Sequence, residues 1–145
     1  MSKIHEIKKG PLTITYDFYE VITQDLMIIG SNVEKELEDL PVQYSYYQGI
    51  LVLAKRLLDE ASRKLEQYKA GVRNGKREEG VKLTAAAGED LVNSLPTAVE
   101  LHNKVLDCQE TYGYAKGICN AFEVKRDMLV QLSVNNRQEA RIYQQ

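Results

Sequence analysis

The stretch "YSYYQGILVLAKRLLDEASRKLEQY", residues 44–68, carries the most regular apolar pattern of the chain. Its tyrosine, leucine and alanine side chains recur at alternating steps of three and four residues. The members of this pattern are Tyr44, Tyr47, Leu51, Ala54, Leu58, Ala61, Leu65 and Tyr68. Such a repeat places apolar side chains along one side of a helix, as in the seam of a coiled coil. The stretch therefore predicts a long helix that packs against a partner helix.

A second apolar pattern with the same alternation of steps lies nearer the C-terminus. Its members are Leu101, Val105, Cys108, Tyr112, Ala115, Cys119 and Phe122. Leu129 continues the register, whereas Arg126 interrupts it. Proline is favoured in the first turn of a helix, so Pro96 marks a helix start. We expect a helix of about 60 Å from Pro96 to Asn135, followed by a polar tail over residues 135–145.

Two seams of similar length in one chain predict an all-α fold, an antiparallel coiled-coil helical hairpin. Gly71, Gly75 and Gly80 are expected to break the long helix that contains residues 44–68. Residues 84–93 are expected to form a short helix before the long helix that starts at Pro96. Large and small residues alternate along both seams, so tyrosine and leucine on one helix can fill the space beside alanine and cysteine on the other. Because a single hairpin buries little apolar area, we also expect a homo-oligomer.

The N-terminal part of the chain predicts two further elements. Apolar residues at helical spacing between Ile22 and Leu40 predict an extra N-terminal helix. Pro41 is expected to end this helix or to stand in the first turn of the next one. In the preceding stretch, residues 1–20, alternating apolar residues predict a short strand or an extended arm. We interpret the whole chain as a single helical domain with its helical core over residues 21–134.

Charge is distributed unevenly along the 145 residues, although the net charge is only −2. Residues 11–50 hold seven acids and one base, whereas residues 55–82 hold nine bases and five acids. Such asymmetry matters for binding partners even when the total charge is small. The chain has no run of 18 apolar residues, and its N-terminus lacks the apolar stretch of a signal peptide. We therefore expect a cytoplasmic protein with no membrane association.

Patterns of known catalytic and metal sites are missing. The stretch "NGKREEG", residues 74–80, has a Gly-Lys pair but lacks the spaced glycine and the Ser or Thr of a phosphate-binding loop. The acids of residues 34–39 fit a solvated helix face. The two cysteines and two histidines do not have the spacing of metal ligands. We therefore predict that the chain is not an enzyme and needs no cofactor or metal.

Basic residues between positions 63 and 77 form the candidate nucleic-acid-binding site. They are Arg63, Lys64, Lys69, Arg73, Lys76 and Arg77. We expect the adjacent pair Arg63 and Lys64 on the flank of the seam, and the other four in a flexible, glycine-containing loop. Loop cations, with Tyr47 and Tyr68 as candidate stacking rings that also fit the seam, favour single-stranded nucleic acid over duplex recognition. The alternative is that these cations complement the dipole at a helix C-terminus and keep the surface solvated.

The order of these features resembles the UvsY-type recombination mediators of T-even-like phages. The similarity covers about residues 24–134: an acidic, apolar first helix is followed by a long helix with the sequence Arg63-Lys64-Leu65-Glu66-Gln67-Tyr68. A basic, glycine-containing segment, a short helix and a long C-terminal helix with the segment "AFEVKRDMLVQL" complete it. The basic pair stands one position differently relative to the aromatic residue than in the family, and residues 1–20 are an addition.

This resemblance implies a ring-forming, non-enzymatic protein that binds single-stranded DNA. Such proteins help a RecA-like recombinase to displace single-strand-binding protein, and they act in the host cytoplasm when phage-encoded. Arg63 and Lys64 correspond to the DNA-contacting basic pair of the family. The second hypothesis is a coiled-coil structural or adaptor protein of a phage or multiprotein complex, which does not bind nucleic acid.

Overall fold

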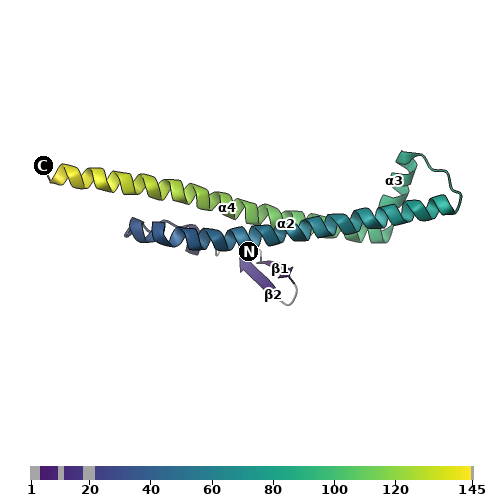
Figure 1. Cartoon of the computed structure of the whole chain (residues 1–145), viewed down its shortest axis with the longest axis horizontal. Helices are drawn as coiled ribbons and strands as arrows, with labels where there is room; N and C mark the ends of the chain where they lie inside the picture. The colour runs from purple at the N-terminus through teal and green to yellow at the C-terminus, as the bar shows by residue number, and fades with distance from the viewer. Residues whose placement is uncertain (1–3, 10–11, 18–21, 145) are drawn as a thin grey trace. The chain divides into compact units, whose positions relative to one another are not determined.

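The computed structural model describes residues 4–9, 12–17 and 22–144, with side chains from residue 24 onward. Two short strands come first, followed by a π-helical turn and three α-helices (Figure 1). In chain order these elements are β1 (Ile4–Lys9), β2 (Leu12–Asp17), η1 (Ile22–Leu26), α2 (Val33–Glu78), α3 (Ala85–Ser94) and α4 (Pro96–Tyr143).

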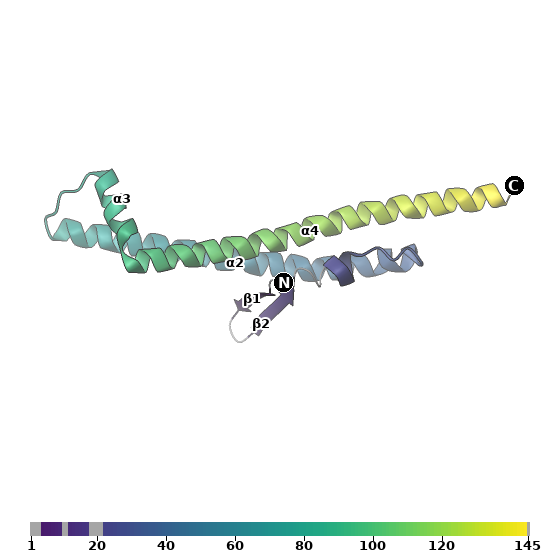
Figure 2. The same ribbon diagram turned by 180° about the vertical axis from the view of Figure 1, so that it is seen from behind.

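The internal contacts group the chain into two compact units. Unit 1 comprises Met1–Leu53 with Gly113–Gln145, and unit 2 comprises Ala54–Tyr112. In each unit a segment of α2 packs antiparallel against a segment of α4, which confirms the predicted helical hairpin (Figures 1 and 2). The short helix predicted between the two long ones is α3, and the Thr84 side chain caps its N-terminus by accepting a hydrogen bond from the Ala87 amide at 3.2 Å.

The core of unit 1 is built around Phe122 of α4, whose side chain is 1% exposed. Its ring stacks on Tyr47 of α2 with a centroid distance of 5.0 Å and an interplanar angle of 24°. Tyr44, one turn earlier on α2, contacts the same ring at 6.2 Å, and its hydroxyl donates to the Glu123 carboxylate at 2.8 Å. Ile50 is also buried in this unit. Aromatic pairs of this geometry stabilise packing beyond the area they bury.

Lys125 is buried in unit 1, with 6% of its surface exposed. Its ammonium group donates to the Asp25 carbonyl oxygen at 2.6 Å and lies 4.0 Å from the Glu36 carboxylate. Glu36 in turn accepts hydrogen bonds from the Ile29 and Gly30 amides, each at 3.2 Å. A buried cation is tolerated when it is paired and hydrogen-bonded in this way. These bonds attach the segment before α2 to both helices of unit 1.

The core of unit 2 is made of smaller side chains. Ala61 and Leu65 of α2 pack with Val105 of α4, and partly buried residues extend this cluster on both helices. These are Leu58, Leu101 and Cys108. From α3, Val92 is fully buried. The large and small residues of the two seams therefore pack together in this unit as expected.

The start of α2 differs from the expectation. The apolar face of residues 22–40 does not form a separate helix, because η1 ends at Leu26 and α2 begins at Val33 and runs through Pro41. The Asn32 side chain accepts a hydrogen bond from the Lys35 amide at 3.1 Å, so Asn32 is the N-cap. Proline inside a helix costs about 3 kcal/mol. Burial of residues on both sides of Pro41 offsets this cost, and the predicted break is wrong.

The predicted breaks at Gly71 and Gly75 are also wrong, since α2 continues to Glu78. A glycine inside a helix costs only about 1 kcal/mol relative to alanine, which packing against other helices can offset. The helix ends at Glu78, and Gly80, whose φ is 77°, follows in the turn after it. The Gly80 amide donates to the Arg77 carbonyl at 3.0 Å, and the Val81 amide to the Lys76 carbonyl at 3.1 Å. This pair of bonds is a Schellman motif.

At the C-terminus, α4 continues past Asn135 to Tyr143, so the predicted polar tail is helical up to that residue (Figure 2). The residues beyond Asn136 include arginine, glutamine, glutamate and alanine, which are strong helix formers. Arg126, which interrupts the sequence register, is exposed, and Lys125 takes the buried position instead. Helix α4 therefore continues through Arg126 and Asn135, although both interrupt the apolar repeat.

Near the N-terminus, β1 and β2 pair antiparallel in a register from Ile4 opposite Asp17 to Lys9 opposite Leu12. The predicted strand corresponds to β2, and its partner β1 comes from the same chain. The rest of the predicted arm, residues 1–3, 10–11 and 18–20, lies outside the described residues.

We expect Phe122→Ala to lower the free energy of unfolding by about 3–5 kcal/mol, because it leaves a cavity beside Tyr47. Urea denaturation followed by circular dichroism at one protein concentration measures this change. Met128→Ala is the matched control on the same helix, since its side chain is exposed and the change should stay within about 0.5 kcal/mol. Equal effects of the two substitutions would contradict the packing described here.

Substitution by alanine should change the stability in opposite directions at two glycines, Gly75 inside α2 and Gly80 just after its C-terminus. Gly80→Ala should destabilise the protein by at least about 1 kcal/mol, because its positive φ strains an L-residue. Gly75→Ala should stabilise it by about 0.5–1 kcal/mol, because the position is helical and an added Cβ meets no atom within 4 Å. Thermal denaturation of both variants tests the sign. A helix that truly broke at Gly75 would give the same sign for both.

Candidate nucleic-acid interface

The six predicted site residues all lie on α2 within unit 2. The expectation that four of them occupy a flexible loop is wrong, because the helix includes every one of these positions. They are Lys69, Arg73, Lys76 and Arg77. A rigid helix fixes the direction of each side chain relative to the seam, at about 100° per residue. The position of each cation around the helix can therefore be compared directly.

Arg63 and Lys64 are exposed, and neither forms an ion pair with any residue that the structure describes. Arg63 lies midway in sequence between the buried seam residues Ala61 and Leu65. By helical geometry it points about 180° away from the seam, and Lys64 about 100° from Arg63. The expected flank position therefore fits Lys64, whereas Arg63 faces directly outward from the hairpin.

Lys69 and Arg73 both form ion pairs with one carboxylate of α3, that of Glu89. The Lys69 ammonium lies 3.3 Å from Glu89 and 3.8 Å from Glu66, and the Arg73 guanidinium donates to the other oxygen of Glu89. The hydrogen bond from Lys69, together with the positive charge of Arg73, lowers the pKa of Glu89, while desolvation opposes this shift. These ion pairs connect α2 to α3, and they give two cations of the predicted binding site a carboxylate partner within the chain.

Lys76 and Arg77 stand in the last turn of α2, where cations complement the helix dipole. Lys76 also forms an ion pair of 2.9 Å with Glu79. Arg77 is exposed and has no ion-pair partner among the described residues. For Lys76, the alternative interpretation as an ordinary helix-end cation describes the structure better than a binding role.

The six cations do not form one surface. Lys69, Arg73 and Lys76 lie about 120–180° around the helix from Lys64. The structure therefore separates an outward basic pair, Arg63 and Lys64, from a second group near the end of α2. The ion pairs of Lys69 and Arg73 with Glu89 join two different helices, so the sequence pattern could not predict them.

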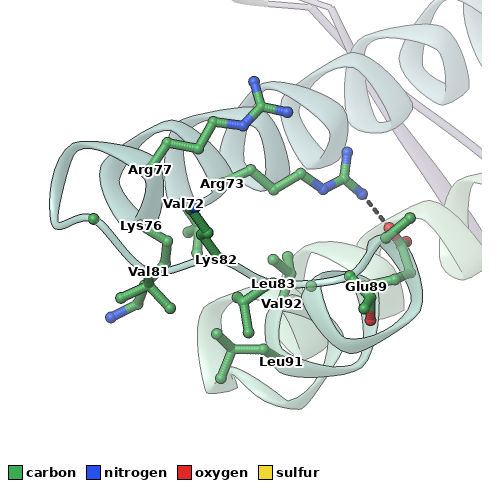
Figure 3. A pocket seen from close by; sticks show the side chains of 14 residues that line it. Val72, Arg73, Lys76, Arg77, Val81, Lys82, Leu83, Glu89, Leu91 and Val92 are labelled. Carbon is green, nitrogen blue, oxygen red and sulfur yellow. Dashed lines mark hydrogen bonds and ion pairs between the residues drawn. The ribbon is translucent and has the colours of Figure 1, made fainter.

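A hollow of about 690 Å³ lies beside this second group, between the end of α2, the connection after it and α3 (Figure 3). We call it the basic hollow. Arg73, Lys76, Arg77 and Lys82 line it, together with the carboxylate of Glu89. Larger aliphatic side chains also line it: Val72, Val81, Leu83, Leu91 and Val92. Lys82 was not among the predicted site residues, although its place two residues after Gly80 puts it in the connection.

The candidate stacking rings belong to the helix packing. Tyr47 is buried and stacks on Phe122, and its hydroxyl donates to the Asp25 carboxylate. Tyr68 is half-buried. Tyr46 is exposed, and its ring packs edge-on against Tyr47 with a centroid distance of 5.1 Å and an interplanar angle of 79°. The core interpretation of Tyr47 is therefore confirmed, and it offers no free face to a nucleotide base.

Other chemistry is limited in the part of the chain that the structure describes. Its His, Cys, Asp and Glu side chains form no cluster of three or more suited to a metal ion. Cys108 and Cys119 are free thiols, and burial raises the pKa of each above the usual cysteine value. Among residues 22–144, no helix carries the sustained apolar stretch that a bilayer crossing requires.

Comparisons with protein-family models, with curated proteins and with solved structures gave no match to this chain.

We expect Lys69→Ala to raise the pKa of the Glu89 carboxyl toward its ordinary value, because it removes the hydrogen bond that lowers this pKa. Carboxyl carbon NMR titration measures the shift, and Lys64→Ala, on a different side of α2, should leave it unchanged. Because the folded-state pKa is lowered, the ion pairs stabilise the α2–α3 contact above the usual glutamate range and are lost as the pH falls through the lowered value. A Glu89 pKa that Lys69→Ala leaves unchanged would contradict this pairing.

Proposed function

We propose that this chain is an oligomeric single-stranded DNA-binding protein that acts as a recombination mediator. The observation that carries the proposal is the pair Arg63 and Lys64, adjacent, exposed and without ion-pair partners among the described residues. Nearby cations of the same helix differ, because Lys55, Arg56, Lys69 and Arg73 each have a carboxylate partner. An unpaired cation can contact a phosphate without first breaking an ion pair.

The side-chain chemistry of the pair suits a flexible strand. Arg63 presents a planar guanidinium that can bind a phosphate through two hydrogen bonds or stack on a base, and Lys64 adds a mobile point charge. Neither residue type in this arrangement reads a base sequence, so we expect binding with little sequence preference.

One pair of cations per chain binds weakly. Each phosphate neutralised on a single strand contributes about −0.7 to the slope of log K against log salt, so two contacts give about −1.4. Several copies along one strand raise the effective concentration of each successive contact. DNA binding at physiological salt therefore depends on association of the chain with itself.

The protein partners come from the resemblance to UvsY-type mediators. By this similarity we propose that the DNA-bound oligomer weakens the hold of single-strand-binding protein and assists a RecA-like recombinase to assemble on the strand. The uncharged, exposed residues of α4 offer area for such contacts, while the basic pair remains on α2.

The second candidate is a structural adaptor without nucleic-acid binding. It is favoured by exposed apolar residues on the unit 1 part of α4, which a soluble helix normally covers with a partner. These are Val124, Met128, Val130 and Val134. An adaptor would associate with itself or a partner and would show no appreciable affinity for single-stranded DNA at physiological salt.

The decisive variant is Arg63→Ala/Lys64→Ala, for which we expect affinity for a single-stranded oligonucleotide to fall by about tenfold or more and the salt slope to flatten by about 1–2. Fluorescence anisotropy across a salt series measures both. Lys55→Ala/Arg56→Ala is the matched control, because it removes another adjacent exposed Lys and Arg from α2 and changes the net charge equally. Its effect on affinity should be clearly smaller.

Light scattering on both variants should give the wild-type mass, since neither pair lies at a buried position. Equal losses of affinity in the two variants would mean that only total charge matters, and the site assignment would fail. Absence of binding by the wild-type protein at about 50 mM salt would favour the adaptor instead.

A further inference from the structure

Two surfaces of this chain carry opposite charges, and each also presents apolar side chains. The first is the basic hollow of unit 2, whose wall includes several aliphatic side chains and whose cations Arg77 and Lys82 have no ion-pair partner among the described residues. The other two cations at the hollow already have a carboxylate partner, Glu89 for Arg73 and Glu79 for Lys76. The hollow therefore presents two available positive charges beside an apolar wall.

The second surface is the segment of residues 27–38 in unit 1, which we call the acidic segment. Met27 and Ile29 lie outside the helices and are 54% and 74% exposed. Glu34 and Glu38 follow one helical turn apart, and both are exposed without an ion-pair partner among the described residues. Asp39, next to Glu38, is paired with Lys35 at 2.8 Å. The segment therefore presents two apolar side chains and two available negative charges.

Hydrogen bonds within unit 1 fix the backbone of the acidic segment. The Glu36 carboxylate accepts hydrogen bonds from the Ile29 and Gly30 amides, and it lies 4.0 Å from the buried ammonium of Lys125. Because the backbone around Ile29 is fixed, little conformational entropy is lost when this side chain enters a pocket.

We propose that the acidic segment of one copy of this chain docks into the basic hollow of a second copy. Ile29 would contact the aliphatic wall, and Glu34 and Glu38 would face Arg77 and Lys82. The residues that line the hollow in the described structure include no aromatic ring, which disfavours a nucleotide base as its occupant.

The proposed contact joins two different surfaces, so it is heterologous. Contacts of this type generate a closed ring or an open filament, depending on whether the rotation between neighbours closes. The docking does not require the DNA-binding function proposed above. It uses neither Arg63 nor Lys64, so these two residues remain available on each copy.

Charge reversal tests the docking directly. Arg77→Glu/Lys82→Glu and Glu34→Lys/Glu38→Lys should each lower the self-association constant at least about tenfold at about 50 mM salt, as measured by sedimentation velocity. Combining all four substitutions in one chain should restore association, and so should an equimolar mixture of the two double variants. Ile29→Asp, at an exposed position, should also reduce the mass of the assembly measured by sedimentation velocity. Circular dichroism verifies that each variant keeps its helix content.

Arg63→Glu/Lys64→Glu is the matched control, with the same change of charge on α2 outside the hollow. It should keep the wild-type mass and lose DNA binding, so the two proposals can fail separately. A monomeric wild-type protein, or double variants that keep the wild-type mass, would overturn the docking. If reversal at the hollow reduces the mass but reversal of the acidic segment does not, another segment occupies the hollow and this occupant is wrong. A fourfold variant that stays dissociated overturns the pairing as well.

Discussion

The packing of α2 against α4 depends on a narrow strip of apolar side chains, because two helices bury only the residues that face each other. In unit 2 this strip consists of small and medium side chains around Ala61, Leu65 and Val105. In unit 1 it is reinforced by the ring of Phe122 between α4 and the tyrosines of α2. So thin a core leaves apolar residues of both long helices in contact with water, and this is the physical reason to expect association with further chains.

Electrostatics then determines which charges of the hairpin remain available. The helical framework places carboxylates one turn from several cations, and α3 brings Glu89 to two more. Ion pairs at exposed positions add little stability. They nevertheless have a functional consequence, because a neutralised cation is a poorer ligand for phosphate or for a partner's carboxylate. Arg63, Lys64, Arg77 and Lys82, which have no ion-pair partner in the part of the chain that the structure describes, therefore carry the two proposals.

Much of the fold follows from periodicity. The alternating steps of three and four predicted both long helices and their pairing, since a strip of this width can be buried only against another helix. The predictions failed where a local signal opposed packing. Pro41, Gly71 and Gly75 were expected to end helices, but tertiary contacts offset their local costs of about 1–3 kcal/mol. Leu40 and Tyr47 are buried on either side of Pro41, and Lys69 and Arg73, on either side of Gly71, form ion pairs with Glu89 of α3. The burial of Lys125 was also not predictable, because its partners, the Asp25 carbonyl and Glu36, lie far away in the sequence.

The sequence alone determined the class of the fold and the location of the basic segment, because helical period and composition are local properties of the chain. It also located the adjacent pair Arg63 and Lys64. Only the tertiary structure decided which cations are free. Glu89 comes from a different helix, and the direction of each side chain depends on α2 continuing to Glu78. The basic hollow exists for the same reason: its wall joins residues of α2, α3 and the connection between them, which become neighbours only when the chain folds.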